Sequence, residues 1–351
     1  MISGVSGEIS GGASIQIAGR SFGTKSPAHP LIWDNFESGT VGARVENQNA
    51  VVGQWQTSAY SSRVFYTDRQ SLSGQKSALH PFYRVDGSDM TNTWSSQLAL
   101  NANSFPLVYA EFFTYYPASN GTASNYKPYR FFGNSDAMQV VMGANCGNMV
   151  VDLLDPPSRF VAYDGTLWQT NRWQQYQILY RQSSQPGQRD AIYRNYVDGQ
   201  TRFTGFYIPG ANPQVYYEPD NLATNHTINQ LRLGGEYFDV GQRGECDPDD
   251  HAELFTDNVY VDTTFARVTI GNANTYDGST IRDIQIPTAW SSGSVTVNVN
   301  LPRFSSGQTA YLYVHDQDDR VNASGYPITI GSSNGGIDTT APAAPGSFRR
   351  E

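Results

Sequence analysis

Residues 173–200 constrain the fold of this chain more than any other part of the sequence. They contain two runs in which apolar or aromatic residues alternate with polar ones, Trp173–Arg181 and Ala191–Val197. Alternation with a period of two is typical of β-strands that bury one face. A polar stretch joins the runs, and Asp198-Gly199 closes the second. Because glycine adopts positive φ without steric cost, an Asp-Gly step favours a tight turn. We therefore predict two antiparallel strands of a half-buried sheet.

The composition favours a β-rich protein and excludes several functions. Aromatic residues make up 13% of the chain, with 22 tyrosines, and charged residues only 16%. Aromatic side chains favour strands, and no stretch shows a convincing helical period. The net charge of −9 argues against nucleic-acid binding, which needs clustered cations. No apolar run approaches the ~20 residues that span a bilayer. We expect neither a nucleic-acid partner nor insertion into a membrane.

The pattern W-x-x-x-x-(I/L/V)-x-Y at Trp173–Tyr180, followed by a strand that ends in Val-Asp-Gly, resembles laminin-G and concanavalin A-like jelly rolls. In those folds two curved antiparallel sheets pack face to face, and the concave face commonly meets carbohydrate. The resemblance covers roughly the middle two thirds of the chain. It implies a jelly-roll sandwich with a hollow side available to a sugar.

A second resemblance concerns both ends of the chain. The pattern G-x-x-I-x-I-x-G-x-x-F-G at 12–23 resembles the opening of an IPT/TIG-type immunoglobulin-like domain. Only the first strands of such a domain fit before the sequence pattern changes at Pro27–Pro30. Short alternating strands recur between 264 and 331. We therefore predict an all-β chain in two sandwiches. The predicted parts are an immunoglobulin-like domain from 1–26 with 264–333, an inserted concanavalin A-like jelly roll at 27–263, and a Pro-rich tail at 334–351. The alternative is an unpaired N-terminal arm followed by two consecutive domains.

Two acidic motifs bracket the predicted insert, Asp34-Asn35-Phe36-Glu37 at its start and DNVYVD at 257–262. The first and last strands of a jelly roll are neighbours, so these carboxylates converge. Calcium takes six to eight hard oxygen ligands. The resemblance to jelly-roll carbohydrate modules, where a calcium in this place is common, implies structural Ca²⁺ at Glu37 and Asp257. The alternative is that these carboxylates only cap local N–H groups in turns.

A saccharide-binding face is the second candidate site. Alternation in Leu107–Tyr116 places every second residue from Tyr109 to Tyr115 on one face. Sugars bind where aromatic rings lie under their C–H faces and polar groups reach their hydroxyls. The alternative is that the aromatics fill the core between the sheets and the charges face bulk water. The predicted ligand-binding residues are Tyr109, Glu111, Tyr115, Arg130, Gln177 and Arg232.

Catalysis is the third candidate. Retaining glycosidases need two carboxylates about 5 Å apart, and the E-x-D-x-x-E type of motif that would supply them on this fold is absent. A polysaccharide lyase needs a group that neutralises the uronate and a Tyr or His base. His80, Tyr129 and Arg130 have that chemistry, although HPFYR and KPYRFFG match no lyase motif. A histidine in a strand is more often structural.

Two cysteines and the N-terminal residues bear on the compartment. Cys146 and Cys246 form either a disulfide that closes a ~100-residue loop or two free thiols. Residues 1–12 lack the basic start and apolar centre of a secretory signal, so we expect a signal removed earlier or release without one. We predict an extracellular, cell-surface or virion location.

The function predicted from these observations is non-catalytic recognition of a polysaccharide or surface glycan at a cell or virion surface. The first alternative is a polysaccharide lyase or hydrolase of jelly-roll type, with a lyase favoured over a hydrolase. The second is a structural or decoration protein that packs into a homo-oligomer, a virion or another extracellular assembly. This prediction of function rests partly on the resemblance of fold, and a fold does not by itself specify a function.

Overall fold

The computed structural model describes residues 2–57, 63–81, 98–117, 126–133, 139–145, 148–155, 158–164, 169–182, 184, 192–204, 228–237 and 253–334. Every regular element in these ranges is a β-strand, which confirms the predicted all-β class. The same ranges contain no helix of the length and apolarity needed to cross a membrane. The strands are β1 (Ile2–Glu8), β2 (Ser14–Gly19), β3 (Ile32–Asp34), β4 (Phe65–Thr67), β5 (Ser77–Pro81), β6 (Leu98–Phe105), β7 (Leu107–Tyr115), β8 (Tyr126–Gly133), β9 (Gln139–Asn145), β10 (Asn148–Asp155), β11 (Ser158–Asp164), β12 (Trp173–Arg181), β13 (Ile192–Val197), β14 (Gln200–Thr204), β15 (Ile228–Tyr237), β16 (Glu253–Asp262), β17 (Arg267–Gly271), β18 (Arg282–Trp290), β19 (Ser294–Asn298), β20 (Thr309–His315), β21 (Tyr326–Thr329) and β22 (Ser333–Asn334).

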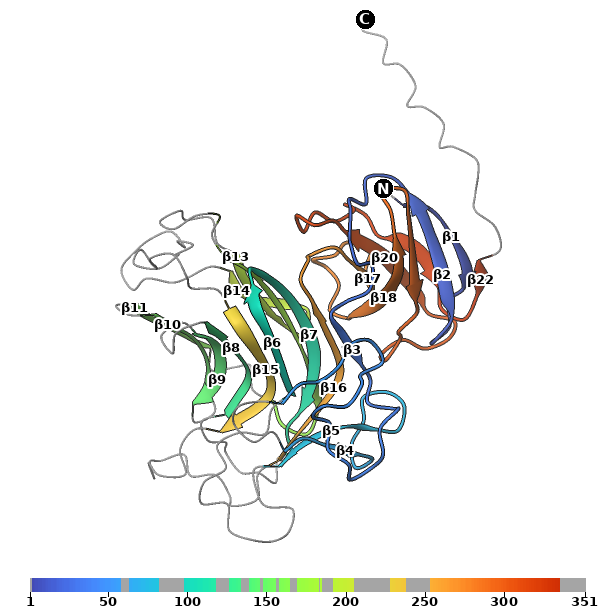
Figure 1. The fold of residues 1–351 in the computed structure, drawn as a ribbon. Coiled ribbons are helices and arrows are strands. Elements are labelled where there is room, and N and C mark those ends of the chain that lie inside the picture. The colour runs from blue at the N-terminus through green and yellow to red at the C-terminus, as the bar shows by residue number, and fades with distance from the viewer. Residues whose placement is uncertain are drawn as a thin grey trace, which may run out of the picture. The chain divides into compact units, whose positions relative to one another are not determined.

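The chain divides into two compact units. One unit combines Met1–His29 with Ala266–Glu351, and the other comprises Pro30–Phe265 (Figure 1). The sequence predicts boundaries after residues 26 and 263, whereas the structure divides into its two units after residues 29 and 265. The predicted tail lies outside the described residues, except for Asn334 in β22.

The smaller unit is a β-sandwich made by one folded sheet. Its strand order is β21-β20-β17-β18-β19-β2-β1-β22. The first part of β18, Arg282–Gln285, pairs with β17, and its second part pairs with β19 from Ile286 onward, with a register shift between Pro287 and Ala289. The change of partner links the two halves of the sheet. The core between the layers includes Val5, Ile15, Ile17, Val268, Ile270, Val295, Val297 and Leu312. The immunoglobulin-like type of this sandwich remains a prediction.

The larger unit consists of two sheets that pack face to face, as the predicted jelly-roll sandwich requires. One sheet has the order β11-β10-β9-β8-β15-β6. The eight-stranded sheet has the order β14-β13-β12-β7-β16-β5-β4, and β3 pairs with β16 beside β5. Apolar side chains of both sheets meet between them and form the main core, which includes Leu98, Leu100, Val108, Ala110, Phe112, Tyr129, Phe131, Tyr176, Ile178, Leu231, Leu233, Val259 and Val261.

Alternation along the strands divides their residues between the core and the outward faces. In β8, Tyr129 and Phe131 enter the core, so Arg130 lies on the outward face of the six-stranded sheet. In β7, Phe112 enters the core, so Glu111 lies on the outward face of the eight-stranded sheet. Figure 1 shows that β8, β9 and β15 are curved, with the hollow side turned away from β7 and β16.

Strand β16 is interrupted by a bulge. Its first half pairs with β5, and its second half pairs with β3. Its register with β7 shifts between Asp257 and Tyr260, and Asn258 adopts a φ of 49°. Asparagine tolerates the left-handed region better than most residues. The bulge turns the polar pair Asp257-Asn258 toward residues 71–73, which follow β4.

Candidate functional site

An aromatic ring in contact with two cations marks the outward face of the six-stranded sheet. The guanidinium carbons of Arg130 and Arg232 lie 4.2 Å and 3.9 Å from the centroid of the Phe132 ring in β8. Arg130 and Arg232 are direct neighbours in the register of β8 and β15. Cation–π contacts of this kind stabilise by about 0.5–2 kcal/mol each. Together with Gln230 and Asn101, described next, we call these residues the Phe132 cluster.

Amide side chains extend the Phe132 cluster across β15 to β6. Arg232 Nε donates to Gln230 Oε1 at 2.6 Å, and Gln230 Nε2 donates to Asn101 Oδ1 at 2.5 Å. The backbone N–H of Asn101 in turn donates to Gln56 Oε1 at 2.7 Å. The amides therefore form a continuous hydrogen-bonded row that fixes the orientation of the Arg232 guanidinium.

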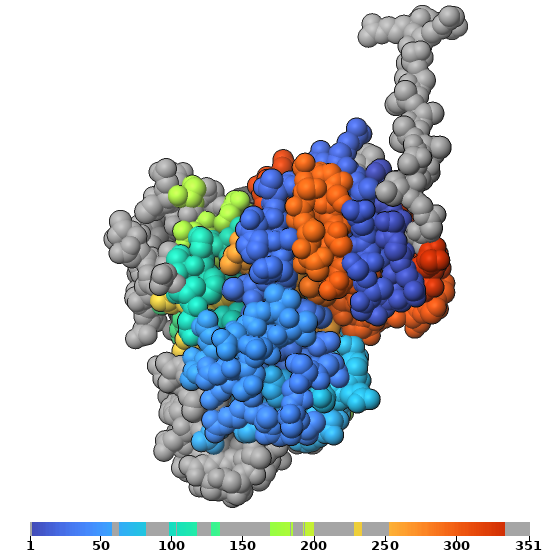
Figure 2. Space-filling model, turned by 45° about the vertical axis from the view of Figure 1, so that its right-hand side comes forward, coloured from blue at the N-terminus to red at the C-terminus, as the bar shows by residue number. Residues whose placement is uncertain are grey.

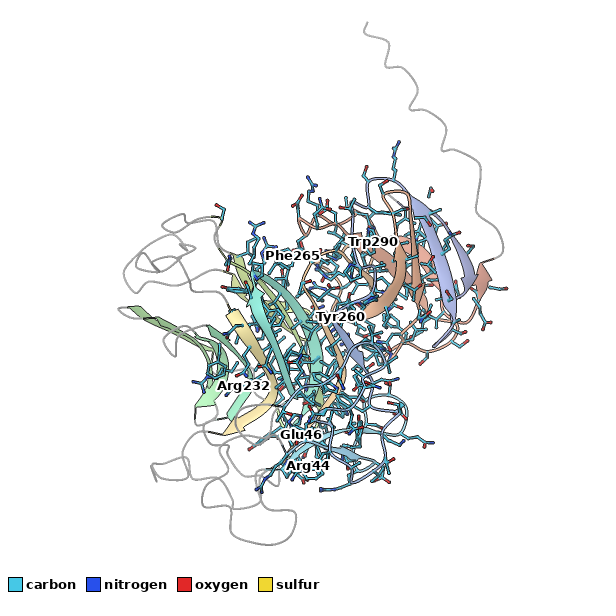
Figure 3. All side chains as sticks on the ribbon, viewed as in Figure 1. Arg44, Glu46, Arg232, Tyr260, Phe265 and Trp290 are labelled. Carbon is cyan, nitrogen blue, oxygen red and sulfur yellow. The ribbon has the colours of Figure 1, made fainter. Side chains whose placement is uncertain are left out.

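Exposure differs within the Phe132 cluster. Arg130 and Arg232 are 7% and 5% exposed, whereas Phe132 and Gln230 are half-buried and Asn101 is exposed. The surface thus presents an aromatic ring and amide groups, and the guanidinium groups lie beneath them. Figure 3 labels Arg232 on this side of the unit.

The other predicted ligand-binding residues lie on the opposite side of the sandwich. Glu111 Oε2 accepts from the hydroxyl of Tyr109 at 2.6 Å and from Gln177 Nε2 at 2.9 Å. Glu111 Oε1 accepts from Gln175 Nε2 at 2.7 Å. These four residues are fully or almost fully buried. Tyr115 lies further along the same face of β7 and is half-buried.

The six predicted ligand-binding residues are therefore not brought together. Arg130 and Arg232 share the Phe132 cluster, and the core of the larger unit separates them from Glu111 and its partners. The residues that the sequence reasoning missed are Phe132, Gln230 and Asn101. Alternation within 129–132 and 230–234 was the available signal for the first two, because it places Phe132 beside Arg130 and Gln230 beside Arg232.

The three residues with catalytic chemistry do not converge either. His80 is fully buried in β5, opposite Leu254 of β16. Tyr129 is fully buried in the core, where its hydroxyl oxygen accepts from Asn195 Nδ2 at 3.1 Å. Arg130 follows Tyr129 in β8 and lies on the outward face. Tyr129 and Arg130 therefore lie on opposite faces of the sheet and cannot act as base and charge-neutralising group on the same sugar.

The predicted metal ligands, Glu37 near the start of the larger unit and Asp257 near its end, both contact the loop of residues 72–76. Asp257 Oδ2 accepts from the backbone N–H groups of Leu72 at 2.8 Å and Ser73 at 3.4 Å. Glu37 Oε1 accepts from those of Gln75 and Lys76, both at 2.8 Å. Both carboxylates thus bind the same short loop.

The charged and polar groups of this junction are buried or half-buried. Burial raises the pKa of Asp257 to about 8, and the nearby charge of Glu37 contributes to the rise. Asn258 is fully buried, and its Oδ1 accepts no hydrogen bond. Lys76 Nζ donates to the backbone oxygens of Glu37 and Gly39, not to the carboxylates. Two carboxylates and an amide oxygen are ligands that suit Ca²⁺.

Two further predictions concern the cysteine pair and a metal site. Cys146 and Cys246 lie outside the described residues, so their pairing stays a prediction. No group of three or more His, Cys, Asp or Glu side chains with metal-binding geometry occurs in the described part of the chain. A cation at Glu37 and Asp257 would therefore depend on amide, hydroxyl or backbone oxygens as well.

Comparison with known proteins gives distant structural resemblances only. No protein-family model matches the chain, and no curated protein matches it. Among solved structures, it resembles an endo-β-1,4-glucuronan lyase from the fungus Trichoderma reesei, with 12% identity over 68% of this chain and 97% of that chain and a TM-score of 0.44. It also resembles the cellulose-induced protein Cip1, with 12% identity, 66% and 97% coverage and a TM-score of 0.41. A third is the receptor-binding domain of botulinum neurotoxin type G, with 9% identity, 87% and 79% coverage and a TM-score of 0.39. The fold assignment rests on sheet order and core, not on these similarities.

Proposed function

We propose that this protein recognises a polysaccharide through the outward, hollow face of the six-stranded sheet. The observation that supports this most is the half-buried Phe132 ring, which the guanidinium groups of Arg130 and Arg232 contact. The part of the ring that these groups leave exposed can pack against the C–H groups of a sugar. Gln230 and Asn101 lie within the same row and can donate to and accept from hydroxyl groups.

We expect this face to prefer acidic chains, because the two guanidinium groups of the Phe132 cluster lie next to its partly exposed amides and ring. Guanidinium groups form charge-assisted hydrogen bonds with carboxylates, which are roughly twice as strong as neutral ones. Because Arg130 and Arg232 are ordered by the ring and by Gln230, little side-chain freedom is lost on binding. We therefore expect uronate-containing polysaccharides to bind more tightly than neutral ones at this face.

Affinity gel electrophoresis with alginate, glucuronan and polygalacturonate in the gel tests the proposal. We expect retardation of the wild-type protein by at least one of these polymers. Phe132→Ala should lower the affinity roughly tenfold, because it removes the stacking ring and the support of both guanidinium groups. Arg44→Ala is the matched control, since Arg44 is an exposed arginine of the same unit.

The position of this control is shown in the figures. Figure 3 labels Arg44 and Glu46 apart from Arg232, and Figure 2 shows the surface of the larger unit formed by residues around 40–57, most of which are exposed. We expect Arg44→Ala to leave the retardation unchanged. If no acidic polymer retards the wild type, or if Phe132→Ala is retarded equally, the proposed face is wrong.

We propose binding without cleavage. His80 and Tyr129 are buried inside the sandwich, so neither is placed as a base beside a sugar on the Phe132 face. Incubation with the same uronates should give no increase in the ultraviolet absorbance of the unsaturated product. A steady increase that disappears in Tyr129→Phe would establish the lyase alternative instead.

Calcium and an exterior location belong to the same proposal. Glu37, Asp257 and Asn258 would hold a structural Ca²⁺, which would neutralise buried carboxylate charge and fix residues 71–76. Such a module fits a protein at a cell or virion surface, including one that packs into an assembly. Light scattering at high concentration tests the assembly: a monodisperse monomer would contradict the structural alternative.

A further inference from the structure

A row of aromatic rings crosses three strands on the outward face of the eight-stranded sheet. Trp173 of β12 and Phe255 of β16 are both direct register neighbours of Tyr115 of β7. The centroid of the Tyr115 ring is 5.7 Å from that of Trp173 and 6.1 Å from that of Phe255. Spacing of this order is comparable with the repeat of an extended chain of pyranose sugars. We call these three residues and Arg69 the Trp173 row.

Two of the rings reach solvent. Trp173 and Tyr115 are half-buried, and the four residues 169–172 that precede Trp173 are all exposed. Phe255 is 1% exposed and lies beside Tyr115, with its ring edge-on to that of Tyr115. At the far end, the guanidinium carbon of Arg69 is 5.5 Å from the Phe255 centroid, and its side chain is 52% exposed. The row therefore offers an accessible ring pair next to an exposed polar group.

The charges along the Trp173 row balance one another. Arg69 makes a two-pronged ion pair with Glu253, with distances of 2.8 Å and 2.6 Å. The ion pair compensates both charges, so Arg69 and Glu253 together carry no net charge. This surface is complementary to an uncharged ligand, in contrast to the Phe132 cluster with its two guanidinium groups.

We propose that the Trp173 row is a second saccharide site, which binds a neutral, soluble polysaccharide chain. Trp173 and Tyr115 stack against sugar rings, and Arg69 with Glu253 hydrogen-bonds to hydroxyl groups beyond them. The planes of Trp173 and Tyr115 are tilted by 54°, and those of Tyr115 and Phe255 by 75°. Rings that are not coplanar fit a twisted single chain and do not fit the flat face of a crystalline polymer.

This site goes beyond the Phe132 face and lies on the other sheet, so the two can be tested separately. The experiment is affinity gel electrophoresis with hydroxyethyl cellulose, xyloglucan and mannan, and a pull-down on crystalline cellulose. We expect at least one soluble neutral polymer to retard the wild type and crystalline cellulose to leave it in the supernatant. Trp173→Ala and Tyr115→Ala should each weaken binding roughly three- to tenfold.

Conservative variants keep the test valid if an alanine variant fails to fold. Trp173→Phe and Tyr115→Phe retain a ring, so they should keep most of the affinity and a wild-type melting temperature. Phe132→Ala should leave the retardation by neutral polymers unchanged, and Trp173→Ala should leave that by acidic polymers unchanged. If the wild type binds neutral polymers but none of the acidic ones, only the Phe132 face is refuted.

Three outcomes would overturn the second site. The first is that none of the soluble neutral polymers retards the wild type. The second is that folded Trp173→Ala is retarded as strongly as the wild type. The third is that Phe132→Ala abolishes neutral binding while Trp173→Ala does not, which would assign all sugar contact to the Phe132 cluster.

Discussion

At the scale of single residues, the larger unit contains buried polar side chains whose oxygens accept hydrogen bonds from specific partners. Glu111 is fully buried, yet both of its oxygens are satisfied by the side chains of Tyr109, Gln175 and Gln177. Asp34 is also fully buried, and it accepts from Trp55 Nε1 at 2.7 Å and from the backbone of Phe36 at 3.0 Å. Such groups restrict which strands can pair, because burying a polar group without a hydrogen-bond partner lowers the stability of the folded state.

Replacing Glu111 by alanine should destabilise the larger unit by about 2–4 kcal/mol. The substitution removes the acceptor that Gln175, Gln177 and the Tyr109 hydroxyl share, and a buried polar group that loses its partner costs about 1–3 kcal/mol. Urea denaturation measures the change. Glu46→Ala, which removes a half-buried partner of the exposed Arg44, should cost less than about 1 kcal/mol. Equal effects of the two variants would contradict the role assigned to Glu111.

Calcium should raise the melting temperature of the wild type, and Asp257→Asn should abolish that increase. The carboxamide keeps the shape of the side chain but removes the buried charge that a cation neutralises. Differential scanning calorimetry with calcium and with EDTA gives the comparison. An unchanged melt of the wild type on chelation would exclude a structural calcium at this place.

At the scale of elements, the loop after β4 depends on close approach of backbone to side chain. Gly74 has a φ of +66°, and a Cβ built on it would lie 2.3 Å from Glu37 Oε1. Glycine is needed for both reasons, because other residues are strained at positive φ. The loop therefore holds Glu37 in place as much as Glu37 holds the loop.

Gly74→Ala should cost about 1–2 kcal/mol and weaken the calcium response without changing any ligand. The new methyl group displaces the Glu37 carboxylate from the N–H groups of Gln75 and Lys76. Titration of the melting temperature with calcium measures both effects. Gly12→Ala is the matched control, since Gly12 also has positive φ (+82°) but no neighbour within 4 Å. A calcium response equal in both variants would contradict the contact.

Local pattern predicts individual strands but not their partners, and it gives no signal for irregular strands such as β1 and β6. Alternation in 107–116 and 173–181 predicts the strands and their faces, and β7 and β12 confirm both. Whether Arg130 and Glu111 share a face depends on long-range pairing, here of β8 with β15 and of β7 with β12. Nothing in a strand's own residues specifies which sheet it joins. For that reason the predicted ligand set mixed residues from two outward faces.

At the scale of the whole molecule, the buried carboxylates make stability depend on pH. The folded-state pKa of Asp257 is raised to about 8, so its protonated form favours the folded state and this contribution is lost as pH rises toward 8. The pKa of His315 is lowered to about 4 by burial, so its contribution changes only between about pH 4 and 6.5 and is complete above that.

Without calcium, the melting temperature should therefore fall as pH rises from about 6.5 to 8. In that window the unfolded chain has already released the proton that folded Asp257 retains. Melts in EDTA across this range measure the slope. Asp257→Asn should flatten it, and a wild-type melting temperature that rises with pH would contradict the assigned burial.

The most direct test of the proposed function is the position of a bound acidic oligosaccharide in a crystal structure of the complex. We predict a sugar ring packed against Phe132, with hydroxyl or carboxylate oxygens within hydrogen-bonding distance of Gln230, Asn101 or the guanidinium groups of Arg130 and Arg232. An oligosaccharide bound elsewhere on the protein, with none on the hollow face of the six-stranded sheet, would contradict it.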